Sequence, residues 1–165
     1  MWIVANIKSK EINVFKKELK IKLNDKIKFY YPKILYKKYF NNKIITKEKP
    51  ILENYIFCFN PKFSDCKILV NLKYCKGLKY FLNNHPIDQQ NILKFINNCK
   101  KFENDKGFLL PDFINSILKN KGKFISGPFK NLIFEIIEKH KKNLKIKIGN
   151  FITTINCNKY LLQPI

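Results

Sequence analysis

The sequence predicts an α+β protein in which an α/β sandwich is followed by a small five-stranded β-barrel. Strand and helix patterns alternate through residues 1–103. After residue 103 the pattern is interrupted by polar residues and Gly107, and from Gly122 onward short apolar strands are separated by turn residues. We therefore expect a first domain at 1–103, a linker at 104–121 and a second domain at 122–165.

The first domain opens with a strand and a helix. Residues 2–7 alternate apolar and polar side chains, as a half-buried strand does. Ser9 is a plausible N-cap, and Glu11 would lie in the first turn of the following helix, where an acid suits the helix dipole. Three apolar residues then recur at helical spacing: Ile12, Phe15 and Leu19.

Residues 27–40 are aromatic and β-branched, with Pro32 as an interruption, and predict extended chain. Residues 43–46 would return as the second arm of a hairpin, and residues 55–59 form a strong strand pattern. If Ile56 and Cys58 face the core, Tyr55 and Phe57 face the opposite side, because strand side chains alternate. That side then needs either a covering helix or a partner.

A short helix is predicted at 64–72 and a strand at 78–82. Asp88 opens a clear helix with one apolar face made by Ile92, Phe95, Ile96 and Cys99. The linker contains a short amphipathic helical pattern behind Pro111. The second domain has a turn at Gly127-Pro128 and an alternating strand at 144–148, and a closed barrel would remove its sheet edges.

Composition limits the function without deciding it. The 165 residues carry a formal net charge of +21, and every basic residue apart from the two histidines is lysine. This charge indicates a polyanionic partner such as nucleic acid, or it reflects the Lys-, Asn- and Ile-rich composition typical of AT-rich genomes. No apolar run is long enough to span a bilayer, and no signal-peptide pattern opens the chain, so we expect a cytoplasmic protein without a membrane partner.

No constellation of residues suggests catalysis. The five cysteines show no CxxC spacing, and His85 and His140 lack a nucleophile or carboxylate at motif spacing. The five glycines form neither a dinucleotide-binding nor a phosphate-binding loop. We therefore predict a protein that is not an enzyme and needs no cofactor or metal.

Two segments resemble signatures of the NusG/RfaH family of transcription elongation and antitermination factors. Residues 50–57, Pro-Ile-Leu-Glu-Asn-Tyr-Ile-Phe, resemble the family's Pro-containing stretch that enters a Tyr-aliphatic-Phe strand. Residues 125–131, Ile-Ser-Gly-Pro-Phe-Lys-Asn, resemble the entry of a KOW domain. Shorter matches fall in the same order: Trp2-Ile3-Val4, Tyr31-Pro32 and Lys76-Gly77-Leu78.

The resemblance implies an NGN domain that binds RNA polymerase, a linker and a KOW β-barrel that binds a second partner. The polymerase-binding residues would be Tyr55, Phe57 and Asn6, although Asn6 is polar where some members are aromatic. Contacts to DNA in the elongation complex would come from a lysine-rich hairpin and a polar turn: Lys33, Lys37, Lys38, Lys43, Ser64 and Lys67. The KOW motif would be Gly127, Pro128 and Phe129. Its partner would be a small-subunit ribosomal protein or Rho, and the chain itself a monomer.

Three alternatives stay open at this point. Asn54 and the missing glycine after Phe129 favour a specialised RfaH-like paralog over the general factor. Some RfaH-like proteins fold the last domain as a helical hairpin, but the alternation at 144–148 and the β-branched run at 152–155 favour strands. An RNA-binding KOW protein of ribosomal type would explain the charge and the barrel but not the first hundred residues.

Overall fold

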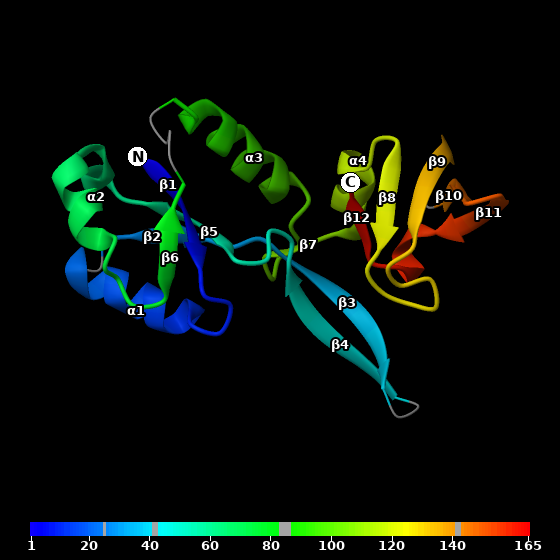
Figure 1. Cartoon of the computed structure of the whole chain (residues 1–165), viewed down its shortest axis with the longest axis horizontal. Helices are drawn as coiled ribbons and strands as arrows, with labels where there is room; N and C mark the ends of the chain where they lie inside the picture. Colours follow the sequence, from blue (N-terminus) through cyan, green and yellow to red (C-terminus); the bar gives the residue numbers. More distant parts are fainter. Residues whose placement is uncertain (25, 41–42, 83–86, 141–142) are drawn as a thin grey trace. The chain divides into compact units, whose positions relative to one another are not determined.

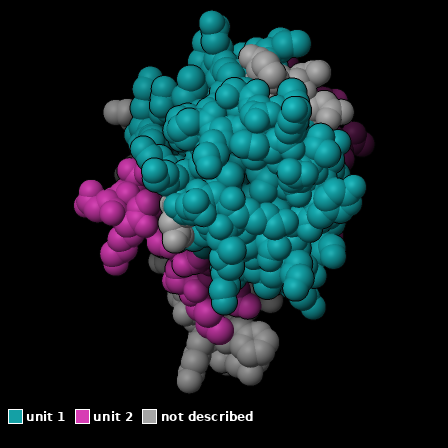
Figure 2. All heavy atoms as spheres, turned by 90° about the vertical axis from the view of Figure 1, so that its left-hand side faces the viewer, with its two compact units in different colours: residues 1–33, 50–101 teal, residues 34–49, 102–165 magenta. Residues whose placement is uncertain are grey.

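The α+β class predicted from the sequence is the class of the structure, a computed structural model that describes residues 1–24, 26–40, 43–82, 87–140 and 143–165. The chain folds into two compact units, coloured separately in Figure 2. Unit 1 comprises Met1–Lys33 and Pro50–Lys101. Unit 2 comprises Ile34–Lys49 and Phe102–Ile165, so it includes both the hairpin and the segment predicted as a linker.

Unit 1 is built on a four-stranded antiparallel sheet in the order β2-β5-β1-β6 (Figure 1). Its strands are β1 (Trp2–Ile7), β2 (Lys28–Tyr30), β5 (Tyr55–Phe59) and β6 (Leu78–Phe81). In the central strand β1, Asn6 lies opposite Tyr55 on one side and opposite Tyr80 on the other. This register brings three polar side chains from distant parts of the sequence to one place on the sheet.

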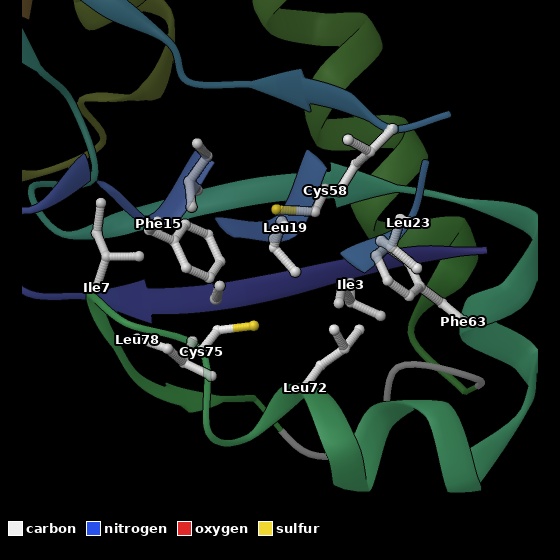
Figure 3. Packing of buried hydrophobic residues seen from close by; sticks show 13 residues of the cluster. Ile3, Ile7, Phe15, Leu19, Leu23, Cys58, Phe63, Leu72, Cys75 and Leu78 are labelled. Atoms are coloured by element: carbon white, nitrogen blue, oxygen red, sulfur yellow. The ribbon is translucent and has the colours of Figure 1, made fainter. Parts of the chain in front are cut away.

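Helices α1 (Ile12–Lys22) and α2 (Cys66–Leu72) cover one face of this sheet. The core between them is formed mainly by fully buried apolar side chains, most of which are labelled in Figure 3: Ile3, Ile7, Phe15, Leu19, Leu23, Cys58, Phe63, Leu72, Cys75 and Leu78. Ile56 and Cys58 are both fully buried on this side, as the strand pattern predicts.

The starts of both helices differ from the sequence prediction. Ser9 is not the N-cap of α1, because Glu11 takes that position without a side-chain cap, and a turn from Lys8 to Glu11 precedes it. The helix predicted at 64–72 is divided into a 3-10 helix, η1 (Pro61–Ser64), and α2. Asp65 separates them and caps α2 by accepting a hydrogen bond from the Lys67 backbone N–H at 2.8 Å.

Helix α3 (Gln89–Lys101) covers the other face of the sheet and packs on a smaller core of Val4, Phe57, Ile92 and Ile96. Figure 1 shows α1 and α3 on opposite sides of the strands. Gln89 fastens the start of α3 to β1, because its side chain accepts from the Trp2 N–H at 2.9 Å and donates to the Trp2 carbonyl at 2.7 Å. Unit 1 is therefore a sheet with helices on both faces, whereas the sequence pattern predicted helices on one side only.

Pro32 divides the extended segment at 27–40 into two strands, because proline has no N–H to continue a ladder. β2 belongs to the sheet of unit 1, whereas β3 (Lys33–Phe40) pairs with β4 (Lys43–Pro50) and with β7 (Phe108–Leu109) in a separate three-stranded sheet. The chain therefore contains one strand more than the sequence pattern predicts for this region.

Unit 2 ends in a five-stranded antiparallel sheet in the order β11-β10-β9-β8-β12. Its strands are β8 (Lys121–Phe124), β9 (Ile133–Lys139), β10 (Asn143–Ile148), β11 (Phe151–Asn156) and β12 (Leu162–Pro164), with the 3-10 helix η2 (Cys157–Lys159) before β12. Leu144 and Ile146 are buried while Lys145 and Lys147 face outward. The strand prediction for this region is confirmed, and the helical alternative is wrong.

The segment predicted as a linker contains ordered elements. Helix α4 (Pro111–Ile117) begins at Pro111, where the sequence predicts a short helix. Phe113 in its first turn and Leu118 directly after it are fully buried. Before it, the Asn104 side chain accepts hydrogen bonds from the backbone of Lys106 and Phe108, both at 3.0 Å, and so holds a tight turn.

Candidate functional site

Three polar side chains form a hydrogen-bonded group on the α3 side of the unit 1 sheet. The Tyr55 and Tyr80 hydroxyls lie 3.1 Å apart, and the Asn6 amide nitrogen donates to the Tyr80 hydroxyl at 3.4 Å. They sit on β5, β6 and β1 respectively, and cross-strand pairing places them side by side. Tyr80 is 47% exposed and Tyr55 is partly exposed, so this end of the sheet face reaches solvent.

Asn6 is the unusual member of the Asn6–Tyr55–Tyr80 group. Only 8% of the residue is exposed, and its Oδ1 atom is buried without a hydrogen-bond partner among the described residues. Buried polar atoms are nearly always paired, because leaving one unpaired costs about 1–3 kcal/mol. The buried, unpaired Asn6 oxygen therefore makes the free energy of folding less favourable.

The two tyrosines have different acidities. The hydrogen bond from Tyr80 lowers the pKa of Tyr55, and the Asn6 amide and the Lys79 ammonium act in the same direction. The hydrogen bond to Tyr55 raises the pKa of Tyr80. Either hydroxyl can be the donor in this pair, and Tyr80 also accepts from Asn6.

Phe57, which the resemblance assigns to the binding surface, is buried in the core of unit 1. Its ring stacks on the Phe95 ring of α3 with centroids 5.4 Å apart and lies 6.2 Å from the Tyr30 ring. Only 4% of the residue is exposed. The strand pattern required either a covering helix or a partner on this face. Helix α3 covers Phe57, whereas Tyr55 stays partly exposed.

Of the residues predicted to contact nucleic acid, those in unit 1 lie at two separate places. Lys33 is the first residue of β3 and follows Pro32, whose carbonyl accepts a hydrogen bond from the Ile51 N–H ahead of β5. Its Nζ lies 6.0 Å from the Tyr31 ring centroid. Ser64 and Lys67 are exposed and follow the other end of β5. Lys37, Lys38 and Lys43 belong to β3 and β4, but their side chains lie outside the described part of the chain.

The three residues of the predicted KOW motif shape the loop between β8 and β9. Gly127 has a φ of +84°, and a Cβ there would come within 3.0 Å of the Tyr160 ring, so glycine is required by conformation and by space. The Phe129 ring packs 5.5 Å from the Phe124 ring, which in turn lies 4.8 Å from Phe134. Pro128 is exposed between them.

The outward face of the five-stranded sheet carries alternating charges. Lys121 Nζ lies 3.0 Å from a Glu135 carboxylate oxygen, and Lys145 Nζ lies 3.5 Å from Glu138. Lys121 holds the pKa of Glu135 below its usual range. His140 at the end of β9 also lies 3.6 Å from Glu138, whereas His85 lies outside the described residues.

Tyr80 is the site residue that sequence reasoning missed. The strand at 78–82 was predicted, but its register against β1 was not, and only that register places Tyr80 beside Asn6. A sequence signal did exist, since Tyr80 is a large aromatic between Lys79 and Phe81 in a short strand. This signal does not show which face of the sheet the Tyr80 side chain occupies unless the pairing of its strand with β1 is known.

The described residues contain neither a metal-binding cluster nor a membrane-spanning helix. No group of three or more His, Cys, Asp and Glu side chains there could hold a metal ion. Across the described ranges, none of the helices combines the length and apolar character needed to cross a membrane.

Comparison with known proteins gives only distant likenesses. No protein-family model matches the chain, and no curated protein matches its sequence. Among solved structures, NusG of Thermotoga maritima is similar over 99% of this chain and 96% of that chain, with 15% identity and a TM-score of 0.33. A chain of the MjSpt4:Spt5 complex is similar over 98% of this chain and 96% of that chain, with 11% identity and a TM-score of 0.26.

Proposed function

We propose that this chain is a transcription elongation factor of the NusG type that binds RNA polymerase through unit 1. The Asn6–Tyr55–Tyr80 group carries the proposal, because it is a partly exposed aromatic and hydrogen-bonding surface that includes an unpaired buried amide oxygen. Aromatic residues with a polar end are enriched at the energetic centres of protein interfaces. The motif at 50–57, which ends in the strand that carries Tyr55, supports polymerase as the partner.

The proposed contact uses Tyr55 and Tyr80 rather than Tyr55 and Phe57. Phe57 has a structural role, because its ring packs against the Phe95 and Tyr30 rings in the core between the sheet and α3. Replacing Phe57 would therefore disturb the fold, and a binding defect in that variant would say little about the surface.

Binding of purified core RNA polymerase to the intact protein tests this function. Wild-type protein should bind, and the double substitution Tyr55→Ala and Tyr80→Ala should weaken binding at least tenfold, since one interface anchor typically contributes about 2 kcal/mol. Tyr74→Ala is a matched control, because Tyr74 is 82% exposed elsewhere in unit 1. Normal binding by a folded double variant would exclude this surface.

We further propose that the hairpin lysines Lys33, Lys37, Lys38 and Lys43, together with Ser64 and Lys67, contact DNA in the elongation complex. Unit 2 would bind a second protein, either Rho or a small-subunit ribosomal protein. The general-factor and RfaH-like alternatives differ in what recruits the protein to polymerase. A tagged protein captured after nuclease treatment should retain polymerase in both cases, and a requirement for one DNA element would favour the specialised paralog.

RNA binding through unit 2 is the alternative function, and the charge pattern of its sheet argues against it. Glu135 and Glu138 lie among Lys121, Lys145 and Lys147, so much of the positive charge on this face is paired. Loss of all co-purifying protein after nuclease treatment would nevertheless favour an RNA-binding module over an elongation factor.

A further inference from the structure

The unpaired Oδ1 atom of Asn6 is the one buried side-chain N or O atom in the described part of the chain that has no hydrogen-bond partner. It sits in a strand whose neighbouring residues Val4 and Ile7 are buried apolar side chains. An apolar residue at this position would avoid the unpaired oxygen. The amide is therefore a cost to the free protein that a role in binding would offset.

The Asn6 amide does little to hold unit 1 together. Its hydrogen bond from Nδ2 to the Tyr80 hydroxyl is 3.4 Å long, near the limit for a hydrogen bond. Tyr80 lies on β6, an edge strand of the sheet, and nearly half of its surface is exposed. Tyr80 is held here by hydrogen bonds of its hydroxyl to Asn6 and Tyr55 and belongs to neither core cluster, so its ring can shift without disturbing the core.

We infer that Asn6 Oδ1 accepts a hydrogen bond from an uncharged donor of the bound partner, an amide N–H or a hydroxyl, once the Tyr80 ring moves aside. This inference rests on the proposed function, since it specifies the chemistry by which the same surface recognises its partner. Asn6 thereby becomes a specificity-determining residue beside the proposed anchors Tyr55 and Tyr80.

The charges around the site decide in favour of an uncharged donor. Lys79 precedes Tyr80 in the sequence and the chain carries a formal net charge of +21, so the potential around the site is positive. A partner lysine or arginine entering here would be repelled, and a partner carboxylate has no proton to donate at neutral pH. An amide or hydroxyl satisfies the oxygen without either penalty.

The test compares the intact wild-type protein with the variants Asn6→Leu and Asn6→Asp in two measurements, thermal unfolding and affinity for purified core RNA polymerase. Leucine has nearly the shape of asparagine and no polar atoms, whereas aspartate keeps two acceptor oxygens and no donor. We expect Asn6→Leu to unfold at or above the wild-type temperature and to bind polymerase about tenfold more weakly. Asn6→Asp should bind within about threefold of wild type, because it still accepts the bond.

Each other outcome overturns the inference. Equal binding by wild type and Asn6→Leu would mean that the amide plays no part in recognition, while the proposed function would stand. A lower unfolding temperature for both Asn6→Leu and the smaller Asn6→Ala would mean that the amide is structural. Equal loss of binding in a folded Asn6→Asp would identify the amide nitrogen, not the oxygen, as the contact. If the wild-type protein does not bind polymerase, the proposed function fails and this inference fails with it. If Asn6→Asp does not fold, the comparison of wild type with Asn6→Leu decides alone.

Discussion

The Phe57 ring stacks on the Phe95 ring at a centroid distance of 5.4 Å and an interplanar angle of 28°. This contact joins β5 to α3 and buries a residue that the family resemblance assigns to the binding surface. It also separates two roles on one strand face, because Phe57 stabilises unit 1 while Tyr55, two residues earlier, stays partly exposed.

The first prediction follows from this packing. Phe57→Ala and Phe95→Ala should each lower the free energy of unfolding, Phe57→Ala by about 3–5 kcal/mol because its side chain is almost fully buried. In a double-mutant cycle the two should show a coupling energy of about 1 kcal/mol. Leu93→Ala on the same helix is the control: Leu93 is 42% exposed, so its change should stay within about 0.5 kcal/mol. Additive losses in chemical denaturation would contradict the stacking contact.

The sequence predicted this region in part, and the parts that it missed have a common cause. Alternation correctly placed Ile56 and Cys58 in one core and Phe57 on the other face. Alternation carries no information about what lies over that face, and the cover depends on tertiary packing of α3 some thirty residues later. Tyr80 was missed for the same reason, because the register between β1 and β6 is set by pairing and not by either strand alone.

Local residue chemistry predicted the turns and interruptions better. Pro32 was recognised as an interruption, but the sequence could not show that β3 leaves the first sheet for a different one. The N-cap at Ser9 was wrong because capping preference is weak compared with the geometry of the preceding turn. The alternating strand at 144–148 was correct because its lysines and isoleucines match the two faces of one sheet.

The second prediction concerns the ionisation of the tyrosine pair. The Tyr55–Tyr80 hydrogen bond lowers the pKa of Tyr55 and raises that of Tyr80, so with rising pH Tyr55 should ionise before, and Tyr80 after, an ordinary tyrosine with a pKa of about 10. Tyr80→Phe should move the pKa of Tyr55 upward, and Tyr55→Phe should move that of Tyr80 downward. Carbon-13 NMR of labelled tyrosine rings across the alkaline range measures both, and unchanged titrations in the two variants would show that the hydroxyls do not interact.

The third prediction uses two glycines with nearly the same backbone conformation. Gly77 and Gly107 have φ values of +80° and +75°, so alanine should cost about 1–2 kcal/mol at either position through conformation alone. A Cβ at Gly77 would also lie 2.9 Å from the Glu11 carbonyl oxygen, a backbone atom at the start of α1, whereas nothing lies within 4 Å at Gly107. Gly77→Ala should therefore lower the free energy of unfolding by at least about 1 kcal/mol more than Gly107→Ala. Equal costs in urea denaturation would mean that α1 is not held against Gly77 as described.

The last prediction concerns nucleic acid. Lysine without arginine provides point-charge contacts to phosphate but few two-pronged contacts to bases, so binding to unrelated duplexes should differ little in strength. The logarithm of the binding constant should fall linearly with the logarithm of salt concentration. Lys33 and Lys67 lie toward opposite ends of β5, so they reach different phosphates if both bind.

Lys33→Gln and Lys67→Gln should each reduce the magnitude of that salt slope by up to about 0.9, and the double variant by the sum, because each removes one phosphate contact and the two sites do not touch. Lys121→Gln is the control for Lys67→Gln, because the Glu135 carboxylate lies 3.0 Å from Lys121 Nζ and competes with phosphate for it. Fluorescence anisotropy with one short duplex over a range of salt concentrations measures the slopes of the wild type and the four variants. An unchanged slope for the double variant would show that neither Lys33 nor Lys67 contacts nucleic acid. A strong preference for one duplex that persists at high salt would show that the protein recognises bases rather than phosphates.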